Sequence, residues 1–176
     1  MKTLNNKLST ATFLLLALFG MAAIYRGPLT ADEPIRQAAT HAAKSSADTV
    51  LKDAHLIEPE ELAKKISGPK EGVPVIFFVG YAVLYRGAHI PGAQNAGPAS
   101  TKEGIDQLKS LAYPLPLDRE IVIYCGCCPF DKCPNILPAY HALEAMGFKR
   151  LEILDLPQSF AHDWVEKSLP VIRGHG

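Results

Sequence analysis

All four cysteines of the chain lie within one short stretch, at Cys125, Cys127, Cys128 and Cys133. A thiolate is both a strong nucleophile and a soft metal ligand. Such a cluster therefore favours covalent sulfur chemistry, dithiol–disulfide exchange or metal binding. Cys125 and Cys128 also have the Cys-x-x-Cys spacing that is typical of dithiol exchange.

The residues around the cysteines predict a strand on one side and a helix on the other. Residues 121–124 are apolar, β-branched or aromatic and predict a buried strand. Pro134 suits the first position of a helix that Gly147 ends. A loop between the carboxyl end of a strand and a helix N-terminus is where α/β folds place reactive groups. There the helix dipole stabilises an anion, so we expect the pKa of the Cys125 thiol to be lowered.

Cys125 is the predicted nucleophile because it directly follows the strand. Arg86, on an earlier segment, is a candidate for binding an anionic substrate, although an exposed and solvated arginine is the expectation that its residue type favours. His89 is expected to be structural and not a base. The residues that are expected to support Cys125 all belong to its loop, and they are Gly126, Cys127, Cys128, Lys132 and Cys133.

The remaining pattern alternates strands with helices over short connections. This order predicts a single α/β domain with a mostly parallel central sheet and helices on both faces. A capping box formed by Ser100 and Glu103 begins one of these helices, and Trp164 is expected in the core. The other predicted elements are strands at 73–79 and 151–154, helices near 59–66, 105–111 and 159–167, and a loop or short turn at 80–86.

The N-terminus has the pattern of an export signal. Lys2 and Lys7 precede an apolar run over residues 11–24, which is short for a full membrane span. We therefore expect a signal peptide or membrane anchor at 1–24, a linker at 25–50, and the folded domain at 51–176, outside the cytoplasm. With 18 basic and 18 acidic residues, the chain shows no charge pattern for binding nucleic acid.

Three segments, in order, resemble a rhodanese-like domain over residues 54–172. Ala88-His-Ile-Pro-Gly-Ala-Gln-Asn95 resembles a turn motif of that family. Residues 121–125 resemble the strand that delivers its catalytic cysteine, and 146–171 resemble its C-terminal run. The chain departs from the family where an Asp, an Arg and a Glu are usual, because Phe78, Gly80 and Leu84 stand there. The chain also has a longer cysteine loop, and residues 157–160 replace a Gly-Gly pair.

The resemblance implies sulfur transfer, in which the Cys125 thiolate takes a sulfur atom from a small donor such as thiosulfate. The resulting persulfide is then passed to a thiol or another nucleophilic acceptor. Phosphatase chemistry is disfavoured, because no arginine follows the cysteines before Arg150.

Two other functions remain open. The first is a thiol–disulfide redox protein that uses Cys125, Cys128 and Cys133. The second, less favoured, is a protein that binds a metal through its thiolates. Neither a metal site nor a cofactor is predicted, because so short a stretch leaves little chain to wrap a tetrahedral site. In an oxidising compartment we expect a disulfide between Cys133 and Cys128 in the resting protein.

Overall fold

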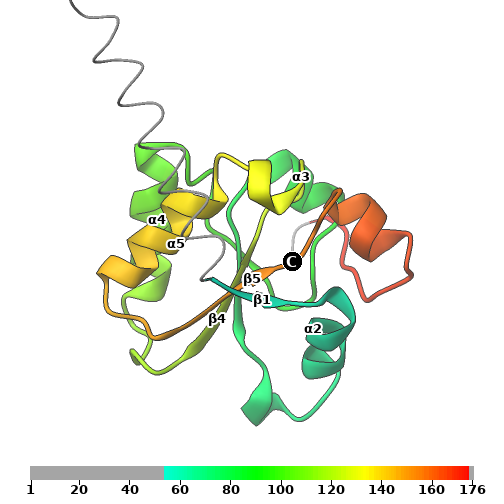
Figure 1. Ribbon diagram of the computed structural model, residues 1–176, viewed down its shortest axis with the longest axis horizontal. Helices are drawn as coiled ribbons and strands as arrows, with labels where there is room; N and C mark the ends of the chain where they lie inside the picture. The colour runs from blue at the N-terminus through cyan, green and yellow to red at the C-terminus, as the bar shows by residue number, and fades with distance from the viewer. Residues whose placement is uncertain (1–53, 175–176) are drawn as a thin grey trace, which may run out of the picture.

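The computed structural model describes residues 54–174, and these form a five-stranded sheet, around which the helices are arranged (Figure 1). The strand order is β1-β5-β4-β2-β3, and every pair of neighbours is parallel. The predicted α/β class with a parallel sheet is therefore confirmed. The strands are β1 (His55–Ile57), β2 (Val75–Phe78), β3 (Gln94–Asn95), β4 (Glu120–Tyr124) and β5 (Arg150–Leu154).

Helices cover both faces of the sheet, as expected. In Figure 1, α4 and α5 lie side by side on one face, while α2 and the C-terminal turn η3 lie on the other. The helices are α2 (Pro59–Ile66), α3 (Ala82–Gly87), α4 (Lys102–Ala112) and α5 (Ile136–Ala145). The short helical turns are η1 (Lys70–Gly72), η2 (Phe130–Lys132) and the π-helical η3 (Ala161–Val165). Among the described residues, no helix is long and apolar enough to cross a membrane.

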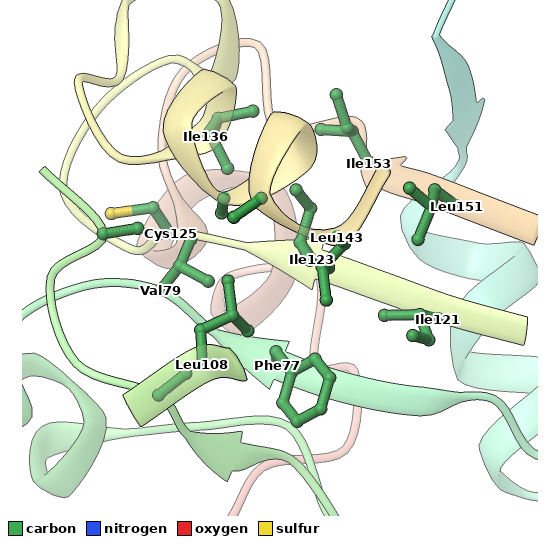
Figure 2. Close-up of a cluster of buried hydrophobic side chains, with 14 of the residues drawn as sticks. Phe77, Val79, Leu108, Ile121, Ile123, Cys125, Ile136, Leu143, Leu151 and Ile153 are labelled. Carbon is green, nitrogen blue, oxygen red and sulfur yellow. The ribbon is translucent and has the colours of Figure 1, made fainter. Parts of the chain in front are cut away.

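Strand β4 divides its side chains between two hydrophobic cores, because successive residues of a strand point to opposite faces. Ile121 and Ile123 pack with α4 and α5 (Figure 2). Val122 and Tyr124 pack in the second core, with α2, α3 and Trp164. Trp164 is fully buried and donates a hydrogen bond from Nε1 to a backbone oxygen, which confirms its predicted place in the core.

Two predicted helix starts lie one or two residues away from the observed ones. Helix α4 is capped by Thr101, whose hydroxyl accepts a hydrogen bond from the Gly104 N–H at 3.1 Å, so the predicted Ser100 box is wrong. Helix α5 begins at Ile136 and not at Pro134. Its N-cap residue, Asn135, uses its side chain elsewhere, and the residues before it form a turn.

Four other elements differ from the sequence analysis. The segment predicted as a loop or short turn at 80–86 contains α3, and the helix predicted near 159–167 is confined to η3. Strands β1 and β3 were not predicted. The expected signal or anchor at 1–24 and linker at 25–50 lie outside the described residues.

Candidate active site

The cysteine loop begins at the centre of the sheet and folds back over its carboxyl edge. Strand β4 ends at Tyr124, whose carbonyl accepts a hydrogen bond from the Val79 N–H at 2.9 Å. Further along, the Phe130 N–H donates to the Leu156 carbonyl at 3.0 Å. These two bonds fix both ends of the first half of the loop to neighbouring segments of the sheet. The turn η2 then leads towards α5.

Cys125 is the first residue after β4, and its side chain is buried. Only 3% of its surface is exposed, and it belongs to the core formed with α4 and α5. In Figure 2 the Cys125 side chain lies at the edge of this core, at the end where Val79 and Ile136 are drawn. The structure thus places Cys125 at the strand end and near a helix start, as the sequence predicted, but inside the core. Its role as a nucleophile stays a prediction.

Two of the other thiols lie close to Cys125, and the third lies beside Cys127. The Sγ atoms of Cys125 and Cys127 are 3.5 Å apart, and those of Cys127 and Cys128 are 3.1 Å apart. The sulfurs of Cys125, Cys127 and Cys133 all lie within 4.8 Å of one another. Cys133 is buried, Cys128 is half-buried and Cys127 is exposed. The loop therefore connects a buried thiol to solvent through an exposed one.

All four cysteines are free, so the disulfide expected between Cys133 and Cys128 is absent from the structure. The Cys133 thiol belongs to the close group with Cys125 and Cys127. The spacing along the chain could not decide which thiol Cys133 would approach, because that depends on how η2 folds the loop back.

Asn135 is a site residue that the sequence analysis missed. Its side chain is buried, and its amide Nδ2 donates to the Cys125 sulfur at 3.6 Å and to the Cys133 sulfur at 3.9 Å. Its Oδ1 accepts a hydrogen bond from the Ser100 N–H at 2.9 Å. This bond orients the amide, so that its N–H groups point at the two buried sulfurs.

The expected lowering of the Cys125 pKa is wrong. The Cys133 thiol beside it and burial in the core both raise the pKa of Cys125 far above its ordinary value. Burial also raises the pKa of Cys127, and it raises that of Cys128 to about 11. The dipole argument assumed a thiol open to solvent, whereas low polarity around Cys125 disfavours the charged form. The raised pKa values favour the neutral thiol form of Cys125, Cys127 and Cys128.

The two predicted cationic residues are exposed, and neither forms a hydrogen bond with a cysteine of the loop. Lys132 is exposed in η2 and forms no ion pair with another described residue. Arg86 is exposed too, and it lines a cavity of about 530 Å³ with Tyr85 and His89 that none of the four cysteines lines. The expected role of Arg86 in binding an anionic donor stays a prediction. His89 is buried, and its Nδ1 lies 2.8 Å from the Tyr85 carbonyl oxygen. This burial and this contact with the backbone are consistent with the structural role that the sequence analysis expected.

No protein-family model matches the sequence, and no curated protein does either. Solved structures do match. The BH2092 protein of Bacillus halodurans is similar with a TM-score of 0.53 and 21% identity, over 79% of this chain and 86% of that one. The Alr3790 protein of Anabaena, which contains a rhodanese-like domain, matches with a TM-score of 0.50 and 18% identity, over 66% of this chain and 81% of that one. The chain has the rhodanese-like fold.

A thiosulfate sulfurtransferase of Pseudomonas aeruginosa has 27% identity to this chain and a TM-score of 0.50. The match covers 69% of this chain and 20% of that enzyme, so this rhodanese-like chain corresponds to a small part of it.

Aromatic packing fills the place where the rhodanese-like family usually has a polar cluster. Phe78 packs against Tyr85 and Tyr124, with ring centroids 5.6 Å and 5.3 Å away. A Cβ atom on Gly80 would lie 2.8 Å from Cζ of Phe78 and 3.0 Å from the Cys125 sulfur, so only glycine fits there without displacing these side chains. Gly126 is half-buried, and a Cβ on it would lie 3.4 Å from the Phe78 ring. The wall of the site behind Cys125 is therefore apolar.

Proposed function

We propose that this protein transfers sulfur through a persulfide on Cys125. The observation that carries the proposal is the position of Cys125, directly after the central strand of a rhodanese-like fold. An oriented amide from Asn135 faces its sulfur at 3.6 Å. A persulfide anion needs N–H donors around it, and the Asn135 amide supplies them together with the nearby start of α5.

The reaction has two steps that balance in atoms and electrons. The Cys125 thiolate attacks the outer sulfur of a donor such as thiosulfate, the S–S bond of the donor breaks, and sulfite leaves with the electron pair. The thiolate of an acceptor then attacks the outer sulfur of the Cys125 persulfide, and the Cys125 thiolate is released. This is covalent catalysis by a soft nucleophile. Both partners are small molecules or thiols that reach the carboxyl edge of the sheet.

The test compares two cysteine variants with thiosulfate as the donor. Cys125→Ser should abolish both turnover and the mass increase of one sulfur atom that marks the persulfide. Cys127→Ser, a matched change on an exposed residue two positions away, should still form the persulfide. Turnover by the Cys125→Ser protein at the wild-type rate would refute the assignment of the nucleophile.

The pH dependence provides a second test. Because the pKa of Cys125 is raised, its thiolate is scarce near neutral pH, and the first step should accelerate as pH rises. We expect the rate of persulfide formation to rise steadily from pH 7 into the alkaline range. A rate that stays constant over this range would mean that the reacting group is already ionised at pH 7.

A second candidate function is thiol–disulfide exchange. It is favoured by the 3.5 Å separation of the Cys125 and Cys127 sulfurs, from which a disulfide can form with little movement. Peptide mapping of the oxidised protein without reductant tests it. A Cys125–Cys127 disulfide that a dithiol reductant removes, in a protein that forms no persulfide, would favour exchange over sulfur transfer.

We also propose that the domain works outside the cytoplasm, on the basis of the N-terminal sequence alone. Lys2 and Lys7 before the apolar run at 11–24 support export. Cell fractionation of the full-length protein is the test. Recovery of the intact chain in the cytosolic fraction would contradict this proposal and leave the sulfur chemistry unaffected.

A further inference from the structure

Three sulfur atoms on this loop lie close enough together to share one ion. The Sγ atoms of Cys125, Cys127 and Cys133 are mutually within 4.8 Å, and the first two are 3.5 Å apart. A metal–thiolate bond is about 2.3 Å long, so three sulfurs in a plane around one ion are about 4 Å apart. The observed 3.5 Å separation and the 4.8 Å limit lie on either side of this value. Binding would require only small movements of the side chains.

The polar surroundings of these sulfurs resemble the outer shell of a metal site. Thiolate ligands need hydrogen-bond donors around them, which orient the ligands and disperse their charge. Asn135 donates to both buried sulfurs of the group and is itself held by the Ser100 N–H. The third sulfur, that of Cys127, is on an exposed residue and gives an ion a path from solvent.

The structure assigns these three thiols to a site for a single Cu(I) ion. Thiolates are soft ligands, and Cu(I), zinc and iron–sulfur clusters are what they select. Zinc and clusters favour four ligands in a tetrahedron, whereas Cu(I) is satisfied by three sulfurs. The group in which every sulfur lies within 4.8 Å of every other has three members and contains no histidine or carboxylate. The Cys128 sulfur is 3.1 Å from that of Cys127 but lies outside this group. The number and the type of the ligands therefore point to copper.

Binding replaces three S–H protons with one ion. Cu(I) and three thiols give a copper tris-thiolate with two negative charges and release three protons. The start of α5 and the Asn135 amide face this charge. The copper-bound form cannot carry a persulfide on Cys125, because the same sulfur is a ligand. This inference goes beyond the proposed function and does not depend on it.

The experiment is a competition between the reduced protein and a chromophoric Cu(I) chelator, without oxygen. The wild-type protein should retain one Cu(I) per chain. Cys133→Ser should weaken retention by at least about a hundredfold, more than a change in the outer shell typically does. Cys128→Ser, a matched change in the same loop, should retain copper as the wild type does. X-ray absorption should find three sulfur neighbours at about 2.3 Å.

Cys127→Ser provides an independent measurement if the buried Cys133→Ser change prevents folding. Because Cys127 is exposed, this variant should fold and should lose copper to the same extent. Three results would overturn the assignment: a wild-type protein that loses its copper to the chelator, a Cys128→Ser loss equal to that of Cys133→Ser, or tight binding of zinc with weak binding of Cu(I). Persulfide formation by the metal-free protein, measured separately, reports on the proposed function alone.

Discussion

Replacement of Asn135 by leucine tests whether its amide stabilises the Cys125 thiolate. Leucine has nearly the shape of asparagine, so the change leaves no large cavity, but it removes both functions of the amide. The Ser100 N–H loses its acceptor at 2.9 Å, and the Cys125 sulfur loses its donor at 3.6 Å. The first loss should affect stability and the second should affect reactivity.

The two effects have different expected sizes. The hydrogen bond from the Ser100 N–H is only part-buried and Ser100 is exposed, so its loss should lower the free energy of unfolding by about 0.5–1.5 kcal/mol. A hydrogen bond to a charged group contributes about 1.5–3 kcal/mol, and the long N···S distance favours the lower end. Since about 1.4 kcal/mol corresponds to a tenfold change, the thiolate population at fixed pH should fall roughly tenfold.

The assay is the rate at which iodoacetamide alkylates Cys125, followed peptide by peptide with mass spectrometry near pH 8. Asn95→Leu is the matched control. Its Oδ1 also accepts a backbone N–H, that of Gly97 at 3.1 Å, but no contact joins its side chain to the cysteines. Asn135→Leu should alkylate about ten times more slowly than Asn95→Leu. Equal rates in these two variants would refute a role of the amide in stabilising the thiolate.

Three further changes test the surroundings of the site. Gly80→Ala would place a Cβ atom 3.0 Å from the Cys125 sulfur, so urea denaturation should show a loss of about 1–3 kcal/mol; an unchanged midpoint would mean that the site has free space. Thr101→Ala removes the cap of α4 and should cost about 1 kcal/mol in a thermal melt, and a wild-type melting temperature would argue against the cap. Burial raises the pKa of Asp163, but hydrogen bonds from His162 and two backbone N–H groups outweigh this and lower it below 3.8. The carboxylate therefore stabilises the fold above about pH 4, and this stabilisation is lost as pH falls through the lowered pKa. Asp163→Asn should therefore lower the free energy of unfolding at pH 7. In the variant, the free energy of unfolding should also fall less as the pH is lowered into the acid range.

The parts of the fold that the sequence predicted are those with a strong local pattern. Helix α2 has the predicted bounds, because Pro59 and the apolar face that includes Leu62 determine it locally. The apolar runs also predicted the bounds of the three longer strands, β2, β4 and β5, to within one or two residues. Strands β1 and β3 have only three and two residues, and they exist because the sheet edge beside them pairs with their backbone. Segments of two or three residues are too short to show the alternation of apolar and polar residues that predicts a strand.

The site was predicted in position but not in chemistry. The end of a strand can be read from an apolar run, so Cys125 was correctly placed at the carboxyl end of β4. The direction of its pKa shift was wrong, because the shift depends on the Cys133 thiol beside it and on burial in the core, and the sequence does not show how the loop and the core fold around Cys125. Asn135 was missed for the same reason. Its local sequence suggests a helix cap, whereas its partners, Ser100 and Cys125, come from two other segments of the fold.

Because β4 lies at the centre of the sheet, its stability does not depend on the cysteine loop that follows it. The strand is paired on both edges, by β2 and β5, and both of its faces are covered. Residues 126–134 lie between this fixed strand and α5 and contribute few of the fully buried side chains. We therefore expect that this loop can be replaced as a unit while the sheet and the helices keep their structure. A shorter loop with a different set of polar groups, grafted between Cys125 and Asn135, would change the reactivity of the same cysteine while the sheet beneath it stays folded.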